Sequence, residues 1–247
     1  MSTSERKVAA DEVNDEDRMW MPGVSGVRGG VIIDAASLDK PLELDAQVAI
    51  VGSGAGGSVL ASRLTQAGIR VVMLEAGPWV TKDQFNLREE DAFGAMYQDR
   101  GTRFTGDGSI GILQGRTAGG GTTINWTTCY RTPDHVLDHW ARVHGVDGLT
   151  SNALEPHFEV IEKRLNISKW PVELANANNR KLLDGARKLG WQAAATKRNV
   201  KGCANSGYCG MGCPVDAKQG MHLTYLPDAL EAGMTLIVNS PVQRLVR

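Results

Sequence analysis

The chain has 247 residues, of which 42% are hydrophobic and 22% are charged, so it can bury the core of a globular fold. The formal net charge is −1 and no basic patch is clustered, which excludes a general electrostatic attraction to DNA, RNA or an anionic membrane surface. The length is that of one large domain, or of one and a half smaller ones.

The first segment, residues 1–45, is predicted to be a polar tail followed by an arm that packs on the main body. The stretch from Met1 to Arg18 is mainly acidic and lacks the apolar run of a secretory signal. No part of the sequence approaches the ~20 apolar residues that a membrane helix needs. We therefore expect a cytoplasmic protein without a transmembrane segment. The expected anchors of the arm are Trp20, Met21 and the run Val31-Ile32-Ile33.

The next segment, residues 46–130, is predicted to be an α/β core around a dinucleotide-binding turn. The apolar run 48–51 predicts a strand, a glycine-rich turn follows it, and a helical pattern comes next. Gly52 would permit the sharp turn, Gly54 would let the main chain approach phosphates, and Gly57 would let the helix pack on the strand. N–H groups and the helix dipole would then meet a pyrophosphate. Its expected contacts are Gly52, Ser53, Gly54, Ala55, Gly56 and Gly57.

A second apolar run, residues 71–74, predicts the neighbouring parallel strand. It ends at Glu75, whose carboxylate can accept hydrogen bonds from both hydroxyls of an adenosine ribose. The same carboxylate would repel a 2′-phosphate, so a plain ribose is favoured over that of NADP.

A second glycine-rich loop runs from Gly115 to Asn125 and follows a short predicted strand at residues 110–113. Its three consecutive glycines, 119–121, allow another close approach of the main chain to a flat or charged ligand. Two such loops, about sixty residues apart, suit a ligand longer than NAD. The alternative is a glycine-rich turn that serves packing alone.

The segment 131–200 is predicted to be helix-rich. Apolar residues recur at helical spacing over residues 134–144 and 152–165, and a third helical pattern at 180–189 stops before Gly190. By itself this pattern indicates ordinary core packing. These segments also carry four of the five histidines, which we expect at the surface or in packing rather than in catalysis: His135, His139, His144 and His157.

The last segment, residues 201–247, combines a cysteine-rich loop with a return to the core. Three cysteines at the spacing C-x5-C-x3-C could bind an iron–sulfur cluster: Cys203, Cys209 and Cys213. A zinc site would normally show paired C-x2-C ligands and a fourth ligand, for which Cys129 or His222 is the candidate. A disulfide is disfavoured in the cytosol, and plain structural thiols are the simplest interpretation.

Together these motifs resemble the glucose-methanol-choline (GMC) oxidoreductase family, flavoenzymes that oxidise alcohols. The resemblance covers roughly residue 46 to the C-terminus, and its matching segments are 52–57, 74–77, 115–125 and 236–245. Within the family, residues 119–129 and 218–226 are most similar to the long-chain fatty alcohol oxidase branch.

The resemblance implies an α/β, Rossmann-like FAD-binding domain, here incomplete, in which 131–200 begins the substrate-side layer. Asn125 would lie beside the flavin and Val242 against the adenine. Some relatives bind flavin covalently through a histidine of the second loop, but this loop has none, so we expect non-covalent FAD. Ala118 replaces a larger aliphatic residue, and Tyr130 places an aromatic residue one position late. The other residues implied to line the cofactor are Glu75, Ala76, Arg116, Gly119, Gly120, Thr123 and Trp126.

By the same resemblance, the enzyme would take a hydride from the CH–OH group of an alcohol onto flavin N5 and release an aldehyde. Family members are longer, and their catalytic histidine lies near a C-terminus that this chain does not contain. We therefore expect the N-terminal half of the enzyme, without its catalytic base. The expected partners are an alcohol, long-chain alcohols included, and a C-terminal half or an electron-acceptor protein; nucleic acid is not expected.

Two other functions stay open at this point. A catalytically inactive fragment would bind FAD or a partner chain without turning over an alcohol. An alcohol or sugar dehydrogenase would carry an iron–sulfur cluster on the three cysteines, because membrane-associated sugar dehydrogenases of the same broad family have a similar spacing. A two-dinucleotide flavoprotein would require a second GxGxxG downstream, and the sequence contains none.

Overall fold

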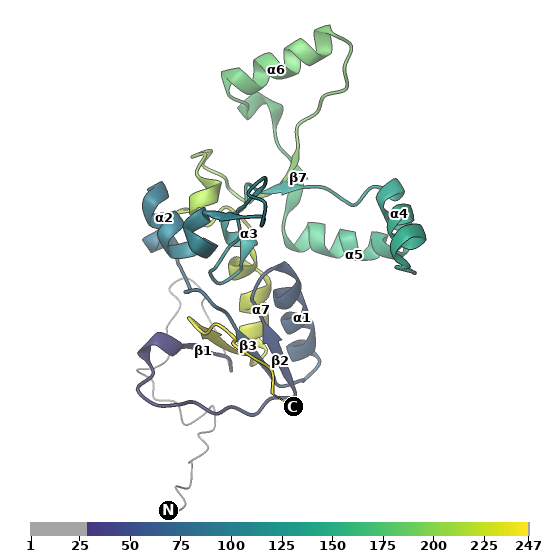
Figure 1. Cartoon of the computed structure of the whole chain (residues 1–247). Helices are drawn as coiled ribbons and strands as arrows, with labels where there is room; N and C mark the ends of the chain where they lie inside the picture. The colour runs from purple at the N-terminus through teal and green to yellow at the C-terminus, as the bar shows by residue number, and fades with distance from the viewer. Residues whose placement is uncertain (1–28, 247) are drawn as a thin grey trace, which may run out of the picture. The chain divides into compact units, whose positions relative to one another are not determined.

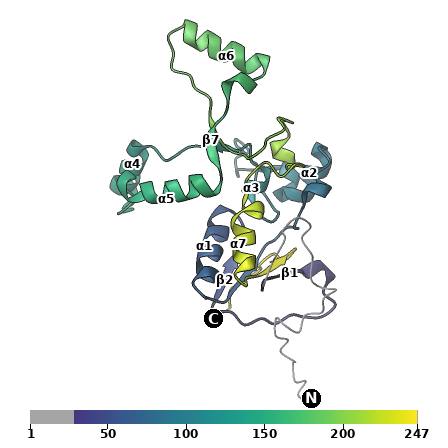
Figure 2. The ribbon, with the colours of Figure 1, turned by 180° about the vertical axis from the view of Figure 1, so that it is seen from behind.

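The computed structural model describes residues 29–246, which divide into two compact units. Of these residues, unit 1 contains 29–125 and 204–246, and unit 2 contains 126–203. Figure 1 and Figure 2 show the elements of each unit from opposite sides. Trp20 and Met21, the expected anchors of the N-terminal arm, lie outside the described residues.

Unit 1 is built on a four-stranded, wholly parallel sheet with the order β1-β9-β3-β2. Its strands are β1 (Val31–Asp34), β2 (Val48–Val51), β3 (Val71–Leu74) and β9 (Thr235–Val238). The predicted strands 48–51 and 71–74 are confirmed, with Val48 paired to Val71. All four residues of β9 are buried, as expected for an inner strand of a parallel sheet. This strand ends at Val238, well before the end of the matched segment 236–245.

The run Val31-Ile32-Ile33 is a strand of this sheet rather than a packing arm. It forms β1, which pairs in parallel with β9 through Val31 and Thr235. Ile33 is fully buried and packs with Ile237, while Leu38, Leu42 and Leu44 cover the pair. The sequence pattern did not predict this pairing, because a short apolar run does not reveal whether it pairs with a strand or only packs on one.

Two helices accompany the sheet of unit 1, and they lie side by side in both views (Figures 1 and 2). They are α1 (Ala55–Gln66) and α7 (Tyr225–Glu231). The buried face of α1 carries only small side chains, Ser58, Ala61, Ser62 and Thr65, which allow the two helices to approach closely. The helix begins at Ala55, inside the glycine-rich turn, because Gly54 is its N-cap residue.

Smaller elements complete unit 1. They are α2 (Glu89–Met96), the hairpin of β4 (Arg103–Phe104) with β5 (Gly111–Ile112), and α3 (Gly121–Ile124). A second apolar core joins α2 and α3 to the cysteine-rich loop, and it contains Val80, Phe85, Ala92, Met96, Tyr97, Ile124 and Met211. Short 3-10 helices lie at Ala35–Ser37, Lys82–Gln84, Gln98–Gly101, Cys209–Met211 and Met221–Leu223.

Unit 2 contains the three predicted helices and a small sheet that the sequence pattern did not predict. The helices are α4 (Asp134–His144), α5 (Ser151–Arg164) and α6 (Ala177–Lys188). The sheet is antiparallel, in the order β6-β8-β7, with strands Thr128–Cys129, Lys197–Asn199 and Ile167–Lys169. A 3-10 helix lies at Val172–Leu174. The side chain of Asn176 caps α6, which therefore begins three residues before the predicted start.

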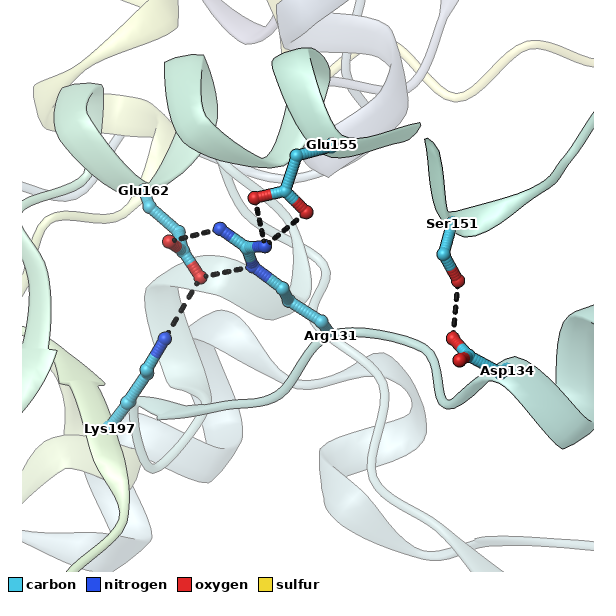
Figure 3. A network of polar contacts seen from close by, with 6 residues as sticks. All are labelled: Arg131, Asp134, Ser151, Glu155, Glu162 and Lys197. Atoms are coloured by element: carbon cyan, nitrogen blue, oxygen red, sulfur yellow. Dashed lines mark hydrogen bonds and ion pairs between the residues drawn. The ribbon is translucent and has the colours of Figure 1, made fainter. Parts of the chain in front are cut away.

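A network of ion pairs holds α5 to this small sheet (Figure 3). Arg131 donates from Nε and Nη2 to the two carboxylate oxygens of Glu162, each at 2.9 Å, and from Nη1 to Glu155 at 2.7 Å. Lys197, on β8, donates to Glu162 at 3.2 Å. The hydrogen bonds from Arg131 are the largest cause that lowers the pKa of Glu162, to about 2. Two cations thus bind this carboxylate in its ionised form.

Candidate functional site

The first glycine-rich turn connects β2 to α1 at the carboxyl end of the parallel sheet. Gly52 has a φ of 89°, and its N–H donates to the carbonyl oxygen of Leu74 at 2.8 Å. A Cβ on Gly57 would lie 2.1 Å from the carbonyl oxygen of Gly52, so only glycine permits this packing of α1 on the turn. A Cβ on Gly52, Gly54 or Gly56 would meet no described atom within 4 Å. These three glycines therefore line an open face at the N-terminus of α1.

Glu75, at the end of β3, connects the two glycine-rich loops through Ser53. Its Oε2 accepts from the N–H of Ser53 at 2.9 Å and from the hydroxyl of Ser53 at 2.6 Å, and its Oε1 accepts from the N–H of Gly77 at 3.0 Å. The hydroxyl oxygen of Ser53 in turn accepts from the N–H of Gly119 at 3.0 Å. Glu75 is 6% exposed, and Ser53 is fully buried.

These bonds limit what Glu75 can offer to a ligand. A carboxylate has about four acceptor positions, and protein donors occupy three of them here. The remaining position, on Oε1, suits one hydroxyl group, whereas we expected the carboxylate to accept from both ribose hydroxyls. Contact of Glu75 with the ribose stays a prediction. The geometry limits it to one ribose hydroxyl as long as Ser53 donates its two hydrogen bonds to Glu75.

The second glycine-rich loop packs directly on the first. A Cβ on Gly120, whose φ is 54°, would lie 2.9 Å from the Cα atom of Gly54. At its other end the loop rests on the segment after β3, since a Cβ on Gly77 would lie 2.0 Å from the carbonyl oxygen of Arg116. The N–H of Ala118 donates to Pro78 at 2.9 Å. The structure thus brings together in unit 1 the predicted residues of the first turn, Glu75, Ala76, Arg116, Gly119 and Gly120.

A buried lysine holds the end of the second loop. The ammonium group of Lys218 donates to the carbonyl oxygens of Thr123, of Asn125 at 3.2 Å and of Cys209 at 2.5 Å. Lys218 is 1% exposed, and this burial lowers its pKa to about 8 although the nearby Cys209 and Cys213 thiols act in the opposite direction. Sequence reasoning did not select Lys218, because nothing in its neighbourhood indicates which backbone groups it would meet.

His222 pairs with the same loop, although the sequence gave it no partner. The hydroxyl of Thr123 donates to Ala118 at 2.7 Å and lies 3.1 Å from Nδ1 of His222, so Nδ1 carries the proton in this pair. His222 is 4% exposed, and burial, followed by the charge of Lys218, lowers its pKa to about 3. Both hydrogen bonds of the Thr123 hydroxyl thus go to other residues of the protein, and they stabilise the second loop.

Two predicted cofactor residues are exposed. Trp126 is the first residue of unit 2 and is 55% exposed. Val242 follows β9 and is 38% exposed. Their contacts with the flavin and the adenine stay predictions.

The structure gives no support to the three cysteines as the ligand set of a cluster. Cys203 belongs to unit 2, while Cys209 and Cys213 belong to unit 1. Within residues 29–246, no three histidine, cysteine or acidic side chains come together in a way that could hold a metal ion. The four cysteines, all of which are described, form no disulfide. The iron–sulfur, zinc and disulfide interpretations therefore find no support in the described part of the chain.

Residues 46–247 match the family model described as GMC oxidoreductase. The chain belongs to the GMC oxidoreductase family. It is 35% identical over 212 residues to an uncharacterised GMC-type oxidoreductase of Mycobacterium tuberculosis, with 85% of this chain and 34% of the relative covered. It is 34% identical over 200 residues to the long-chain-alcohol oxidase FAO4A of Arabidopsis thaliana, with 81% of this chain and 27% of the relative covered. The chain thus spans about a third of the length of the curated relatives it matches.

Solved structures show the same fold at low sequence identity. Pyridoxine 4-oxidase from Mesorbium loti aligns with a TM-score of 0.58 and 18% identity, covering 81% of this chain and 43% of that chain. Formate oxidase of Aspergillus oryzae aligns with a TM-score of 0.51 and 17% identity, covering 78% and 38%. The expected fold, a partial GMC domain of the α/β class on a parallel sheet, is confirmed.

Membership of the GMC family supports FAD as the cofactor, and the residues present fit it. The open glycine face at the N-terminus of α1 leaves the approach that a pyrophosphate needs. Among the helices of residues 29–246, none is long and apolar enough to cross a membrane.

Proposed function

We propose that this chain forms the FAD-binding part of an enzyme that oxidises a primary alcohol to an aldehyde. The observation that carries the proposal is the contact between the two glycine-rich loops. Gly52, Gly54 and Gly56 have no described atom where a Cβ would stand, and Gly120 of the second loop packs against Gly54 beside this open face. The carboxyl end of the parallel sheet, the N-terminus of α1 and the second loop thus meet, and dinucleotides bind at this place in such folds.

Each part of this arrangement has a task. The main-chain N–H groups of the first turn and the dipole of α1 would contact the pyrophosphate directly, with no lysine among its contacts. Glu75 would accept one ribose hydroxyl, Asn125 would lie beside the flavin, and Val242 would contact the adenine. When bound, FAD would supply the hydride acceptor for the alcohol carbon. The loop 115–125 has no histidine, cysteine or tyrosine, which supports non-covalent binding.

The alcohol is proposed from the relatives. Those that share 28–34% identity with this chain include four long-chain-alcohol oxidases of Arabidopsis thaliana, which favours a long-chain primary alcohol as the substrate. His222, the one histidine of the described part of unit 1, is buried and bonded to Thr123, and its depressed pKa keeps it neutral. We therefore assign it support of the loop and no proton transfer.

The cofactor assignment is tested by filling the open glycine face. Gly54 has a φ of −66°, which other residues also adopt, and its Cβ direction is open. Gly54→Val should therefore cost only the roughly 1 kcal/mol of a poorer N-cap residue and leave the chain folded. The valine would stand where the pyrophosphate approaches and should weaken FAD binding at least about 100-fold. Gly185→Val, at an equally open position of α6, is the matched control and should bind FAD like the original chain. Equal affinity of both variants for FAD in a fluorescence titration would remove the assignment.

The substrate is tested with the FAD-loaded protein under anaerobic conditions. In the presence of a C-terminal half that supplies the catalytic base, added 1-dodecanol should bleach the flavin absorption, and dodecane should not. Bound FAD that no alcohol reduces would favour the second candidate, a unit that binds FAD without turning over an alcohol. That candidate is supported by the state of His222, which is buried and bonded to Thr123.

A further inference from the structure

We propose that Lys218 is a positioning residue of the cofactor site, whose ammonium group holds the second glycine-rich loop in the shape that receives FAD. The inference rests on the proposed FAD-binding function and adds a residue that none of the predicted contacts includes. Lys218 reaches two separate segments at once, the end of α3 through Thr123 and Asn125, and the 3-10 helix of the cysteine-rich loop through Cys209.

The short length of α3 explains why it needs hydrogen bonds from Lys218. A helix of four residues, Gly121–Ile124, cannot be stable by itself, and its last carbonyl groups have no partner within the helix. Lys218 satisfies two carbonyls at this end with one charged group, whose hydrogen bonds are the stronger kind. Because α3 continues directly from Gly119 and Gly120, fixing its end also fixes the two glycines that face the first loop.

The neighbours of Lys218 lie along the same loop. The N–H of Met221 donates to the hydroxyl of Thr122 at 2.9 Å, and the imidazole of His222 lies 3.1 Å from the hydroxyl of Thr123. A Cβ on Gly220 would stand 2.9 Å from the carbonyl oxygen of Thr122. Residues 218–222 therefore form one support beneath α3, and Lys218 is its charged member.

The charge of Lys218 is the feature that points to an anionic ligand. Its three hydrogen bonds go to neutral carbonyl oxygens, so a net positive charge remains in the interior behind the loop. Burying such a charge costs stability unless something offsets it. The pyrophosphate of FAD carries two negative charges and would bind on the open side of the same loops. Ligand and lysine would then stabilise each other.

This coupling has a definite pH dependence. Deprotonation leaves Lys218 two N–H donors for three carbonyls and removes its attraction to the pyrophosphate. Bound FAD would raise the pKa of the ammonium group, so by linkage the affinity for FAD should fall as the pH rises through about 8, the pKa of Lys218 in the folded chain. Its surroundings also include the thiols of Cys209 and Cys213, and His222, which stays neutral over this range.

Folding stability should respond to pH in the opposite direction. The ordinary pKa of lysine is 10.5, so between about 8 and 10.5 the unfolded chain binds the proton that the folded chain has lost. The contribution of Lys218 to the free energy of unfolding therefore rises with pH in this window. A lysine that only stabilised the fold would not reduce FAD affinity over the same window.

The experiment measures the dissociation constant of FAD from about pH 6.5 to about pH 9.5, across the pKa range of a buried lysine. The original chain should lose about 10-fold in affinity around pH 8. Lys218→Met should bind FAD about 10- to 100-fold more weakly at neutral pH and should lack this step. The double variant Cys209→Ser with Cys213→Ser should keep the step, because Lys218 bonds to the carbonyl of Cys209 rather than to its thiol.

The possible failures are distinguishable. An original chain that binds FAD with a flat pH profile overturns the role of Lys218 and leaves the proposed function in place. A step that persists in Lys218→Met, or that disappears in the thiol variant, overturns it as well. An original chain that binds no FAD at any pH overturns both proposals. If Lys218→Met does not fold, the profiles of the original chain and of the thiol variant still decide.

Discussion

Replacing Ser53 by alanine should destabilise unit 1 far more than the loss of one hydroxyl normally does. The hydroxyl of Ser53 donates to the carboxylate of Glu75 at 2.6 Å and accepts from the N–H of Gly119 at 3.0 Å. It thus connects β3 to both glycine-rich loops at a fully buried position. Alanine is smaller than serine, so the substitution introduces no clash, and the lost hydrogen bonds account for the whole effect.

The magnitude follows from these two bonds. A hydrogen bond to a charged group contributes about 1.5–3 kcal/mol, and a buried N–H left without a partner costs about 1–3 kcal/mol. The two terms share one oxygen atom and are not additive. We therefore expect Ser53→Ala to lower the free energy of unfolding of unit 1 by about 2–4 kcal/mol.

Hydrogen exchange of peptides from β2 and β3 reads the stability of unit 1 separately from that of unit 2. The matched control is Ser58→Ala, because Ser58 is also fully buried but makes one neutral hydrogen bond, to the carbonyl oxygen of Ser53 at 2.6 Å. Its loss should cost about 1 kcal/mol. If Ser53→Ala costs no more than Ser58→Ala, the bond between Glu75 and the two loops does not stabilise the site as argued.

Two further predictions concern the close packing of α1 and the acid stability of unit 2. Gly57→Ala should lower the free energy of unfolding in urea by more than about 3 kcal/mol, because its Cβ would lie 2.1 Å from a backbone oxygen. Gly56→Ala, where the space is open, should leave the free energy of unfolding nearly unchanged. Similar losses in the two variants would contradict the close packing of α1. The lowered pKa of Glu162 means that its contribution is complete above about pH 4.5 and is lost as the pH falls toward about 2. This acid-dependent loss of stability, about 1–2 kcal/mol, should be absent in Glu162→Gln when hydrogen exchange of β8 peptides is followed against pH. The same acid profile in both proteins would refute the role of Glu162.

The sequence by itself determined the local elements and the chemistry of the first turn. Short apolar runs located β2 and β3, and helical spacing located α4 and α5 within a residue or so, because buried strands are continuously apolar and helical periodicity reports which face is buried. The glycine pattern indicated that α1 starts at a tight turn, and the resemblance carried by the two loops led to the family that the comparisons then showed.

Only the tertiary structure decided which distant residues meet. The pairing of β1 with β9, the bond between Ser53 and Gly119, and the reach of Lys218 to Thr123 join segments far apart in the chain. Such contacts depend on how whole elements pack, and no local pattern of hydrophobicity or turn residues encodes them. For the same reason the sequence left His222 without a partner and did not predict the pairing of β1. A buried polar side chain takes its role from the backbone groups that folding brings beside it.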